Sequence, residues 1–212
     1  MLAQPIIHPP LAELSYNPQF SSPSAVQVRP KVPRKAETPP FNLRAATLED
    51  AQAISDLGAS VFSATFGFSI PAKDLAAYLD EAYSITALQD DILSPKKHVI
   101  VACEPSDGHV IGFAQLTEGT SEPCIEDLAN IVELQRLYVH ADYHGLGLGR
   151  ALTQWTEKVA LDKGYQTMWL GVWEGNFQAQ RIYEAMGFSR AGEHEFQMGR
   201  CIQTDWIMYK AL

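Results

Sequence analysis

Cysteine, basic residues and long apolar runs are all scarce in this sequence of 212 residues. Its three cysteines, Cys103, Cys124 and Cys201, follow neither a metal-binding spacing nor a disulfide framework, and its six histidines are scattered. We therefore expect reduced thiols, no metal site and a cytoplasmic protein, with a nuclear or mitochondrial location still open. No secretory hydrophobic region and no apolar run of membrane-spanning length occurs, so we expect neither a secretory signal nor a membrane helix.

Basic residues are too few to suit a nucleic-acid-binding protein. The chain has 16 Lys and Arg against 25 Asp and Glu, and four of the basic and two of the acidic residues lie within residues 1–40. Residues 41–212 therefore hold 12 basic and 23 acidic side chains, a net charge of −11. Such a surface repels nucleic acid and attracts small cations or basic peptides, although acidic composition also serves solubility alone.

Proline divides the chain into two parts. Nine of the 13 prolines fall within residues 1–40, where acids are almost absent. This composition predicts a disordered tail rather than a packed segment, and the prolines disfavour the amphipathic helix of a mitochondrial presequence. We expect a single folded domain over residues 41–212.

Glycine is concentrated at one informative place. A predicted strand, residues 131–139, is followed by glycines at alternate positions, Gly145, Gly147 and Gly149, and then by a helical pattern that begins at Arg150. Glycine lets the backbone turn tightly and approach a ligand closely, and the N-terminus of a helix suits an anion. The pattern therefore predicts that a phosphate-bearing cofactor lies against this loop.

Other interpretations of the loop remain open. A Walker loop requires a Lys-Ser/Thr pair, which is absent. A dinucleotide loop requires the spacing G-x-G-x-x-G, but the next glycine here is Gly164, a whole helix away, and Glu174 is only a loose match to the expected acid. The glycines could also serve only close packing of a strand against a helix.

A second motif decides among these interpretations. His144 to Gly149 follows the pattern Gln/Arg-x-x-Gly-x-Gly, and Asn176 to Phe188 follows Asn-x-x-Ala-x-x-x-Tyr-x-x-x-Gly-Phe. Together, and in this order, the two motifs resemble the GCN5-related N-acetyltransferase (GNAT) family. The one departure is His144, which stands where the family usually has Gln or Arg.

The resemblance implies acetyl-CoA as acetyl donor and no metal. In the family, the cofactor arm lies beside the strand before the glycine loop, bound by backbone groups, and the pyrophosphate lies on the loop. Carried over, the cofactor-binding residues are Leu137, Tyr138, Val139, His144, Gly145, Leu146, Gly147, Leu148, Gly149, Arg150 and Asn176. Asn176 could equally be a plain helix N-cap.

Two residues are candidates for proton transfer. Tyr183 lies two helical turns after Asn176, and its phenol could protonate the departing thiolate, although a helical tyrosine is more often a packed aromatic. Glu133 stands where several relatives carry a glutamate that acts as the base, and it could accept the proton of the amine if burial raises its pKa. Its alternative is a strand-surface charge paired with Arg136.

The resemblance also implies the fold, and the sequence pattern agrees with it. We expect an α/β (α+β) GNAT fold, with one mixed, twisted sheet of six to seven strands and helices on both faces. Hydrophobic and turn patterns predict strands near residues 41–45, 99–103, 110–116, 131–139, 167–172, 193–198 and 204–209, and helices near residues 51–62, 74–83, 86–93, 149–163 and 177–186.

The acetyl acceptor is the part of the implied function that the sequence determines least. Residues 61–67, 170–174, 194–199 and 204–205 resemble the PaiA-type polyamine acetyltransferases, which implies a small cationic amine as acceptor. Residues 117–130 and the helices near 72–93 would form its pocket, and Trp173 could contact a cation or belong to the core. Acetylation of a protein lysine or N-terminus, acetylation of a metabolite amine, and a non-catalytic acetyl-CoA-binding module remain alternatives. Dimers are common in the family, so a homodimer is compatible.

Overall fold

The computed structural model describes residues 41–198 and 200–212. The expected disordered tail over residues 1–40 lies outside the described residues. The strands are β1 (Asn42–Ala45), β2 (Lys97–Cys103), β3 (Val110–Glu118), β4 (Ile131–Val139), β5 (Thr167–Trp173), β6 (Ser189–Met198) and β7 (Cys201–Ala211). The helices are α1 (Ala51–Phe66), α2 (Ala72–Ala82), α3 (Ile85–Leu93), α4 (Leu148–Asp162) and α5 (Phe177–Ala185).

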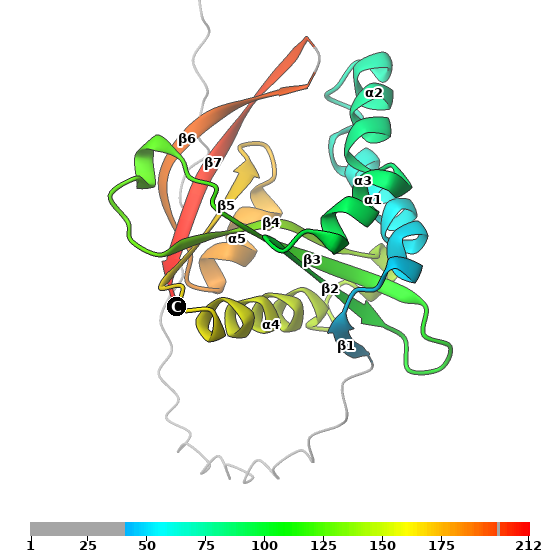
Figure 1. Ribbon diagram of the computed structural model, residues 1–212. Helices are drawn as coiled ribbons and strands as arrows, with labels where there is room; N and C mark the ends of the chain where they lie inside the picture. The colour runs from blue at the N-terminus through cyan, green and yellow to red at the C-terminus, as the bar shows by residue number, and fades with distance from the viewer. Residues whose placement is uncertain (1–40, 199) are drawn as a thin grey trace, which may run out of the picture. The chain divides into compact units, whose positions relative to one another are not determined.

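One mixed sheet organises the described part of the chain, in the order β1-β2-β3-β4-β5-β7-β6. Neighbouring strands are antiparallel except β4 and β5, which are parallel and joined through α4. Figure 1 shows β6 and β7 as a long two-stranded arm at one edge of the sheet. The expected mixed sheet of six to seven strands is confirmed.

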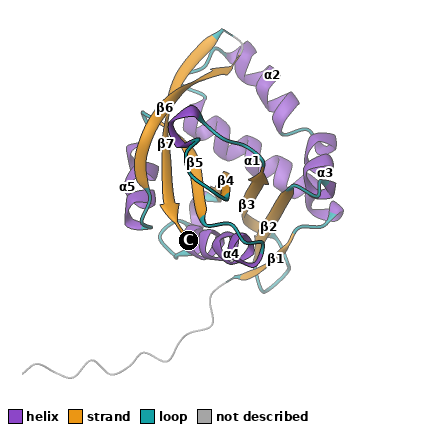
Figure 2. Ribbon diagram, turned by 60° about the vertical axis from the view of Figure 1, so that its left-hand side comes forward, coloured by secondary structure: helices purple, strands orange, loops and turns teal. Residues whose placement is uncertain are grey.

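Helices cover both faces of the sheet (Figure 2). On one face, α4 buries Leu148, Leu152 and Ala160 against the centre of the sheet, and α5 packs on the same cluster. On the other face, α1 and α3 bury Ile54, Leu57 and Leu88 against β2 and β3. No helix among the described residues combines the length and the apolar character needed to cross a bilayer.

The two parallel strands separate soon after they begin. The pairing of β4 with β5 covers only three residue pairs and ends at Glu133 with Trp169. Beyond this point β5 continues beside β7 as far as Trp173 with Asp205, while β4 continues beside β3 to Val139. A gap therefore opens between β4 and β5 at their carboxyl ends.

A bulge in β4 accompanies this separation. Gln115 of β3 is paired with Arg136, whereas the next residue, Leu116, is paired with Leu134, so Gln135 is the extra residue. A bulge bends its strand and increases the local twist. Gln135 thus lies at the point where β4 diverges from β5.

Local sequence accounts for the helices that border the gap. Gly147 immediately precedes α4 and adopts φ +81°, a left-handed conformation that favours glycine. Asn176 caps α5, where its side-chain oxygen accepts a hydrogen bond from the Ala179 amide at 3.1 Å. The predicted N-cap is therefore confirmed, and it leaves the Asn176 amide group free to donate.

Candidate active site

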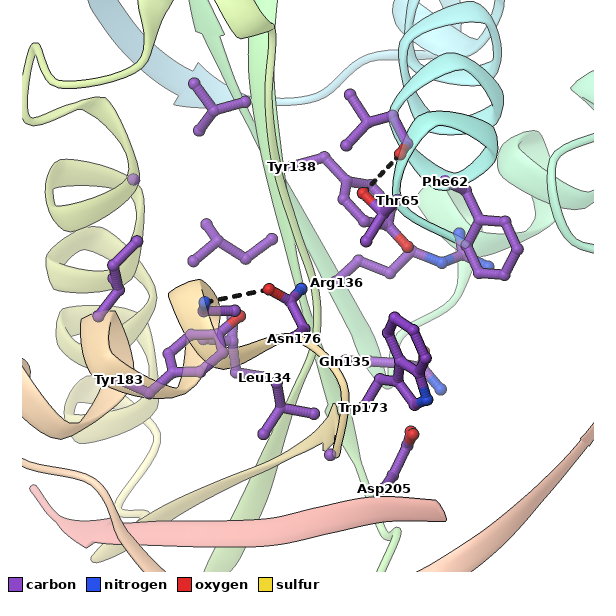
Figure 3. Close-up of a pocket in the computed structure, with 18 of the residues that line it drawn as sticks. Phe62, Thr65, Leu134, Gln135, Arg136, Tyr138, Trp173, Asn176, Tyr183 and Asp205 are labelled. Carbon is purple, nitrogen blue, oxygen red and sulfur yellow. Dashed lines mark hydrogen bonds between the residues drawn. The ribbon is translucent and has the colours of Figure 1, made fainter. Parts of the chain in front are cut away.

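The gap between β4 and β5 opens into a cavity of about 1170 Å³ whose lining comes from both faces of the sheet. On the face of α4 and α5 the lining includes Gly147, Asn176 and Tyr183. On the opposite face it includes side chains of α1, α2, β6 and β7. In Figure 3, Tyr183 lies on one side of β4, and Phe62 and Thr65 lie on the other. One cavity therefore gives access to β4 from both sides of the sheet.

The glycine loop presents unpaired backbone donors to this cavity. Ala151 donates the first backbone hydrogen bond of α4, to the Gly147 carbonyl oxygen at 3.0 Å. The amide groups of residues 145–150 donate to no acceptor within the described part of the chain. Gly145 and Gly147 both have positive φ, and a Cβ added at either would meet no atom within 4 Å. This end of α4 has the geometry expected of an anion site.

The predicted loop residues contribute in different ways. The Leu148 side chain is 1% exposed and belongs to the core, so only its backbone is available to a ligand. Leu146 is 52% exposed, and the Arg150 side chain is also exposed beside the cavity. Gly149 lies within the first turn of α4 rather than in the loop.

His144 uses a ring nitrogen within the protein. Its Nε2 lies 3.0 Å from the Val139 carbonyl oxygen, so this nitrogen carries the proton and donates it there. In the neutral ring the remaining nitrogen is an acceptor, and only the protonated ring donates from both. The neutral side chain therefore cannot replace the donor that Gln or Arg supplies in the family.

The free edge of β4 offers backbone groups from alternate residues. His140 donates to the Ile111 carbonyl of β3, and alternation along an antiparallel strand directs Tyr138 to β3 as well. The backbone groups of Leu137 and Val139 then face the gap. Of the three predicted β4 residues, these two are suited to bind an extended ligand through the main chain.

Tyr183 reaches the cavity from α5. Its half-buried ring packs edge-on against Phe188, with ring centroids 5.8 Å apart. Burial raises the pKa of the phenol well above its usual value, and the nearby Tyr138 adds to this effect. Its hydroxyl takes part in no hydrogen bond with residues 41–198 or 200–212 that the structure records. The phenol therefore keeps its proton at neutral pH and is free to donate it to a ligand.

Glu133 lines the cavity on the other face of the sheet. Burial raises the pKa of its carboxyl; the Thr120 side chain, His194 and Arg136 oppose the rise and Glu122 adds to it. The guanidinium of Arg136 is bonded elsewhere, with Nη1 2.9 Å from a carboxylate oxygen of Asp91. The alternative in which Glu133 is a surface charge paired with Arg136 is therefore wrong.

Three further polar side chains, Glu122, His194 and Asp205, line the same side of the cavity and were not predicted as site residues from the sequence. Nδ1 of His194 on β6 lies 2.8 Å from Glu122, and its Nε2 lies 4.0 Å from Asp205 of β7. Burial raises the pKa of Asp205 to about 6, where His194 opposes the rise and Glu174 adds to it. The only signal in the sequence was that His194 and Asp205 lie within stretches resembling PaiA-type enzymes.

Aromatic side chains complete this side of the cavity. The Trp173 ring lies 5.6 Å from Phe66 and 5.8 Å from Phe68 between centroids, and it packs over Gly175. Trp173 also lines the cavity, near Asp205 (Figure 3). It is therefore both a packed residue and part of the wall. Within the described residues, no group of three or more His, Cys, Asp or Glu side chains is arranged to hold a metal ion.

Comparison with known proteins agrees with this geometry. Residues 64–188 match the Acetyltransferase (GNAT) family. An uncharacterised N-acetyltransferase of Lactobacillus delbrueckii subsp. lactis is 30% identical over 151 residues, which are 71% of this chain and 86% of that protein. An uncharacterised N-acetyltransferase of Mycobacterium tuberculosis is 28% identical over 165 residues, 78% of this chain and 99% of the relative.

Solved structures share the fold. The PaiA N-acetyltransferase of Thermoplasma acidophilum, in complex with coenzyme A, superposes with a TM-score of 0.66 and 23% identity, covering 81% of this chain and 99% of that protein. A putative acetyltransferase of Salmonella typhimurium with its cofactor acetyl-CoA superposes with a TM-score of 0.55 and 21% identity, covering 81% and 94%.

The fold and the matched segment define the class of the protein as an acetyl-CoA-dependent N-acetyltransferase. The chain belongs to the GNAT family.

Proposed function

We propose that the protein transfers the acetyl group of acetyl-CoA directly to a primary amine of a small, cationic, polyamine-like acceptor. The observation that carries the proposal is the single cavity that reaches β4 from both faces of the sheet. Its α4 and α5 side offers backbone donors and a protonated phenol, whereas its opposite side offers carboxylates and aromatic rings. Two substrates could therefore meet at the gap between β4 and β5 from opposite faces.

On the donor side, the amides at the start of α4 would hold the pyrophosphate and the β4 edge would hold the pantetheine arm. Leu137 and Val139 direct their backbone groups into the gap, and the Val139 N–H is the candidate donor to the oxyanion. Asn176 would contribute its free amide group. The remaining loop residues proposed for the cofactor are His144, Gly145, Leu146, Gly147, Leu148, Gly149 and Arg150, with Tyr138 beside them.

Glu133 and Tyr183 would move the protons. The Glu133 carboxylate accepts a proton from the acceptor ammonium, and the neutral nitrogen attacks the thioester carbonyl carbon. The tetrahedral oxyanion then collapses and the carbon–sulfur bond breaks, the attacking nitrogen loses its second proton to solvent, and the Tyr183 phenol protonates the CoA thiolate. The protonated Glu133 and the Tyr183 phenolate return to their starting states by proton exchange with solvent. The raised pKa of Glu133 makes its carboxylate a stronger base. The raised pKa of Tyr183 keeps the phenol protonated until the thiolate forms, but it also makes the phenol a weaker acid.

The cationic character of the acceptor is inferred from charge and ring placement. Glu122, Glu133 and Asp205 line the side of the cavity opposite α4 and α5, which we assign to the acceptor. The basic side chains on this side are His194, which is paired with Glu122, and Arg136, whose guanidinium is paired with Asp91. Aromatic faces such as those of Trp173 and Tyr78 attract organic cations. Stretches of the sequence also resemble the PaiA-type polyamine acetyltransferases, and a PaiA N-acetyltransferase shares the fold.

A second candidate is the amino terminus of a protein. The N-alpha-acetyltransferase RimI of Mycobacterium tuberculosis is 27% identical over 157 residues, 74% of this chain and 84% of that protein. The amino terminus of a peptide is also positively charged and would be attracted by the same carboxylates, Glu122, Glu133 and Asp205.

The test is CoA release from acetyl-CoA with spermidine, spermine, lysine peptides and N-terminal peptides as separate acceptors. We expect turnover with the polyamines and its loss in Glu133→Gln. Selective turnover of N-terminal peptides would replace the polyamine assignment with the second candidate. Binding of acetyl-CoA with no turnover on any of these amines would contradict both and favour a non-catalytic module or another metabolite amine.

A further inference from the structure

A buried polar network lies beneath the bulge of β4. Asp91 of α3 is 7% exposed, and its carboxylate is bonded to Lys97 and, at 2.9 Å, to Nη1 of Arg136. Arg136 also donates from Nη1 to Oε1 of Gln115 at 3.2 Å and from Nη2 to the Ala82 carbonyl at 3.2 Å. Its guanidinium lies 5.2 Å from the centre of the Tyr83 ring. Arg136 therefore joins β4 to α2, α3 and β3.

The network continues to the bulge residue itself. The side-chain oxygen of Gln135 accepts hydrogen bonds from Nε2 of Gln115 and from Oγ1 of Thr117, both at 2.8 Å. Gln115 is fully buried and Thr117 is 6% exposed. The residue that has no partner in the strand ladder is thus held by two side chains of the neighbouring strand.

This arrangement is unusual for the centre of a sheet. In β3, every residue from Val110 to Thr117 is buried, so an apolar side chain would suit position 115. A buried amide requires partners on both its oxygen and its nitrogen; Arg136 donates to the Gln115 oxygen, and the Gln115 nitrogen donates to Gln135 and, at 3.4 Å, to Thr117. Its polarity serves the bulge rather than the packing of the core.

We propose that Gln115, Asp91 and Arg136 are positioning residues that hold the bulge at Gln135 and thereby set the gap between β4 and β5 for the reaction. The proposal rests on the proposed function, because it takes the thioester to be attacked in that gap. The bulge follows the last paired residue, Glu133, and precedes Leu137 and Val139, whose backbone groups face the gap. A shift of the bulge would move the base and the oxyanion donor relative to each other.

The test compares variants in the network with a matched control. Gln115→Leu replaces the amide by an apolar side chain of similar size. Asp91→Asn removes the negative charge that is paired with Arg136 and Lys97. Thr117→Val removes the hydroxyl without changing the shape, and Thr117→Ser restores it. The control is Asp50→Asn: Asp50 is also 7% exposed and is paired with Arg44 at 2.7 and 2.8 Å, but its recorded hydrogen bonds go to Arg44 and Thr47 and not to the network around Gln135.

Steady-state kinetics with acetyl-CoA and spermidine should separate positioning from stability. We expect kcat to fall about 10- to 100-fold in Gln115→Leu and Asp91→Asn, since a misplacement of about 1 Å can reduce rates by that factor. The KM for acetyl-CoA should change by less than about threefold, because the loop supplies most of the binding. Thr117→Val should show a smaller loss that Thr117→Ser reverses. Asp50→Asn should lose thermal stability without losing kcat.

Equal kcat in the network variants and the control, at temperatures where all are folded, would overturn the proposal. If wild-type protein binds acetyl-CoA but turns over no amine, amide hydrogen exchange across residues 134–139 decides instead. Faster exchange there in Gln115→Leu but not in Asp50→Asn supports the proposal, and equal exchange overturns it. Failure of the wild type to bind acetyl-CoA would instead contradict the proposed function, and the exchange experiment would still decide whether the network holds the bulge.

Discussion

Replacing Gly147 by alanine tests the proposed cofactor loop directly, because the same helix supplies a matched control. Gly147 precedes α4 with φ +81°, and Gly164 follows α4 with φ +86°. An added Cβ would meet no atom within 4 Å at either position. Only Gly147 lines the cavity, and the length of α4 separates the two glycines by about 22 Å at 1.5 Å per residue.

Both substitutions should reduce stability by a similar amount. A left-handed conformation costs a residue with a Cβ about 1–2 kcal/mol. For a domain of this size, each 1 kcal/mol lowers Tm by about 2–4 °C. Gly147→Ala and Gly164→Ala should therefore melt at similar temperatures in the absence of ligand.

The two variants should differ in their response to acetyl-CoA. At a concentration about 100 times Kd the ligand stabilises wild-type protein by about 2.7 kcal/mol. The methyl group introduced by Gly147→Ala would occupy the space in front of the free amides, and a tenfold loss of affinity would reduce this stabilisation to about 1.4 kcal/mol. The acetyl-CoA-induced rise in Tm should then be smaller by about 3–5 °C in Gly147→Ala, and unchanged in Gly164→Ala.

The assay is thermal denaturation of wild type and both variants, with and without acetyl-CoA, together with calorimetric Kd values. Equal Kd values in the two variants would refute the assignment of this loop to the pyrophosphate. Loss of binding in both would show that strain in α4, rather than access to the amides, had been measured.

The remaining predictions concern the reacting groups. Tyr183→Phe should lower kcat about 10- to 1000-fold, the range of a lost general acid, with an unchanged Kd for acetyl-CoA, and full activity would remove the phenol from the mechanism. Glu133→Gln should lower kcat about 100-fold or more and abolish the rise of kcat/KM with pH, whereas an intact pH profile would assign the base elsewhere. Burial raises the pKa of Asp205 from 3.8 to about 6, so the affinity for a cationic acceptor should rise as pH increases through about 6, and the KM of Asp205→Asn should lack this change. Because the pKa of Asp205 is raised in the folded state, the native protein binds one more proton than the unfolded chain between pH 3.8 and about 6, and it loses stability as pH rises through this window. Asp205→Asn should therefore gain stability relative to wild type above pH 6. Denaturant titration at pH 5 and pH 8 measures this difference.

The local sequence pattern was sufficient to predict most of the strands and helices. The predicted strands and helices occur with small shifts of their ends, because glycine, proline and capping residues act over a few neighbouring positions. Asn176 shows this clearly: one side chain and one amide three residues later determine where α5 begins. The glycine loop and the Asn-to-Phe motif led to the family for the same reason, since each presents its ligand groups from a continuous segment.

The partners of the charged residues depended on tertiary structure. In a regular strand Glu133 and Arg136, three residues apart, would point to opposite faces, but the bulge at Gln135 changes the alternation. Arg136 is therefore paired with Asp91, 45 residues earlier in the chain, and Glu133 lines the cavity instead.

The sequence by itself determined the family, and it predicted the cofactor loop and the candidate residues Tyr183 and Glu133, because these depend on short spacings and on helix and strand period. Only the tertiary structure decided that Glu122, His194 and Asp205 lie on one side of the cavity and that Gln115 is bonded to the bulge residue. These contacts follow from the order and register of strands that are distant in the chain. Register is set by packing of the whole sheet, which no local pattern contains.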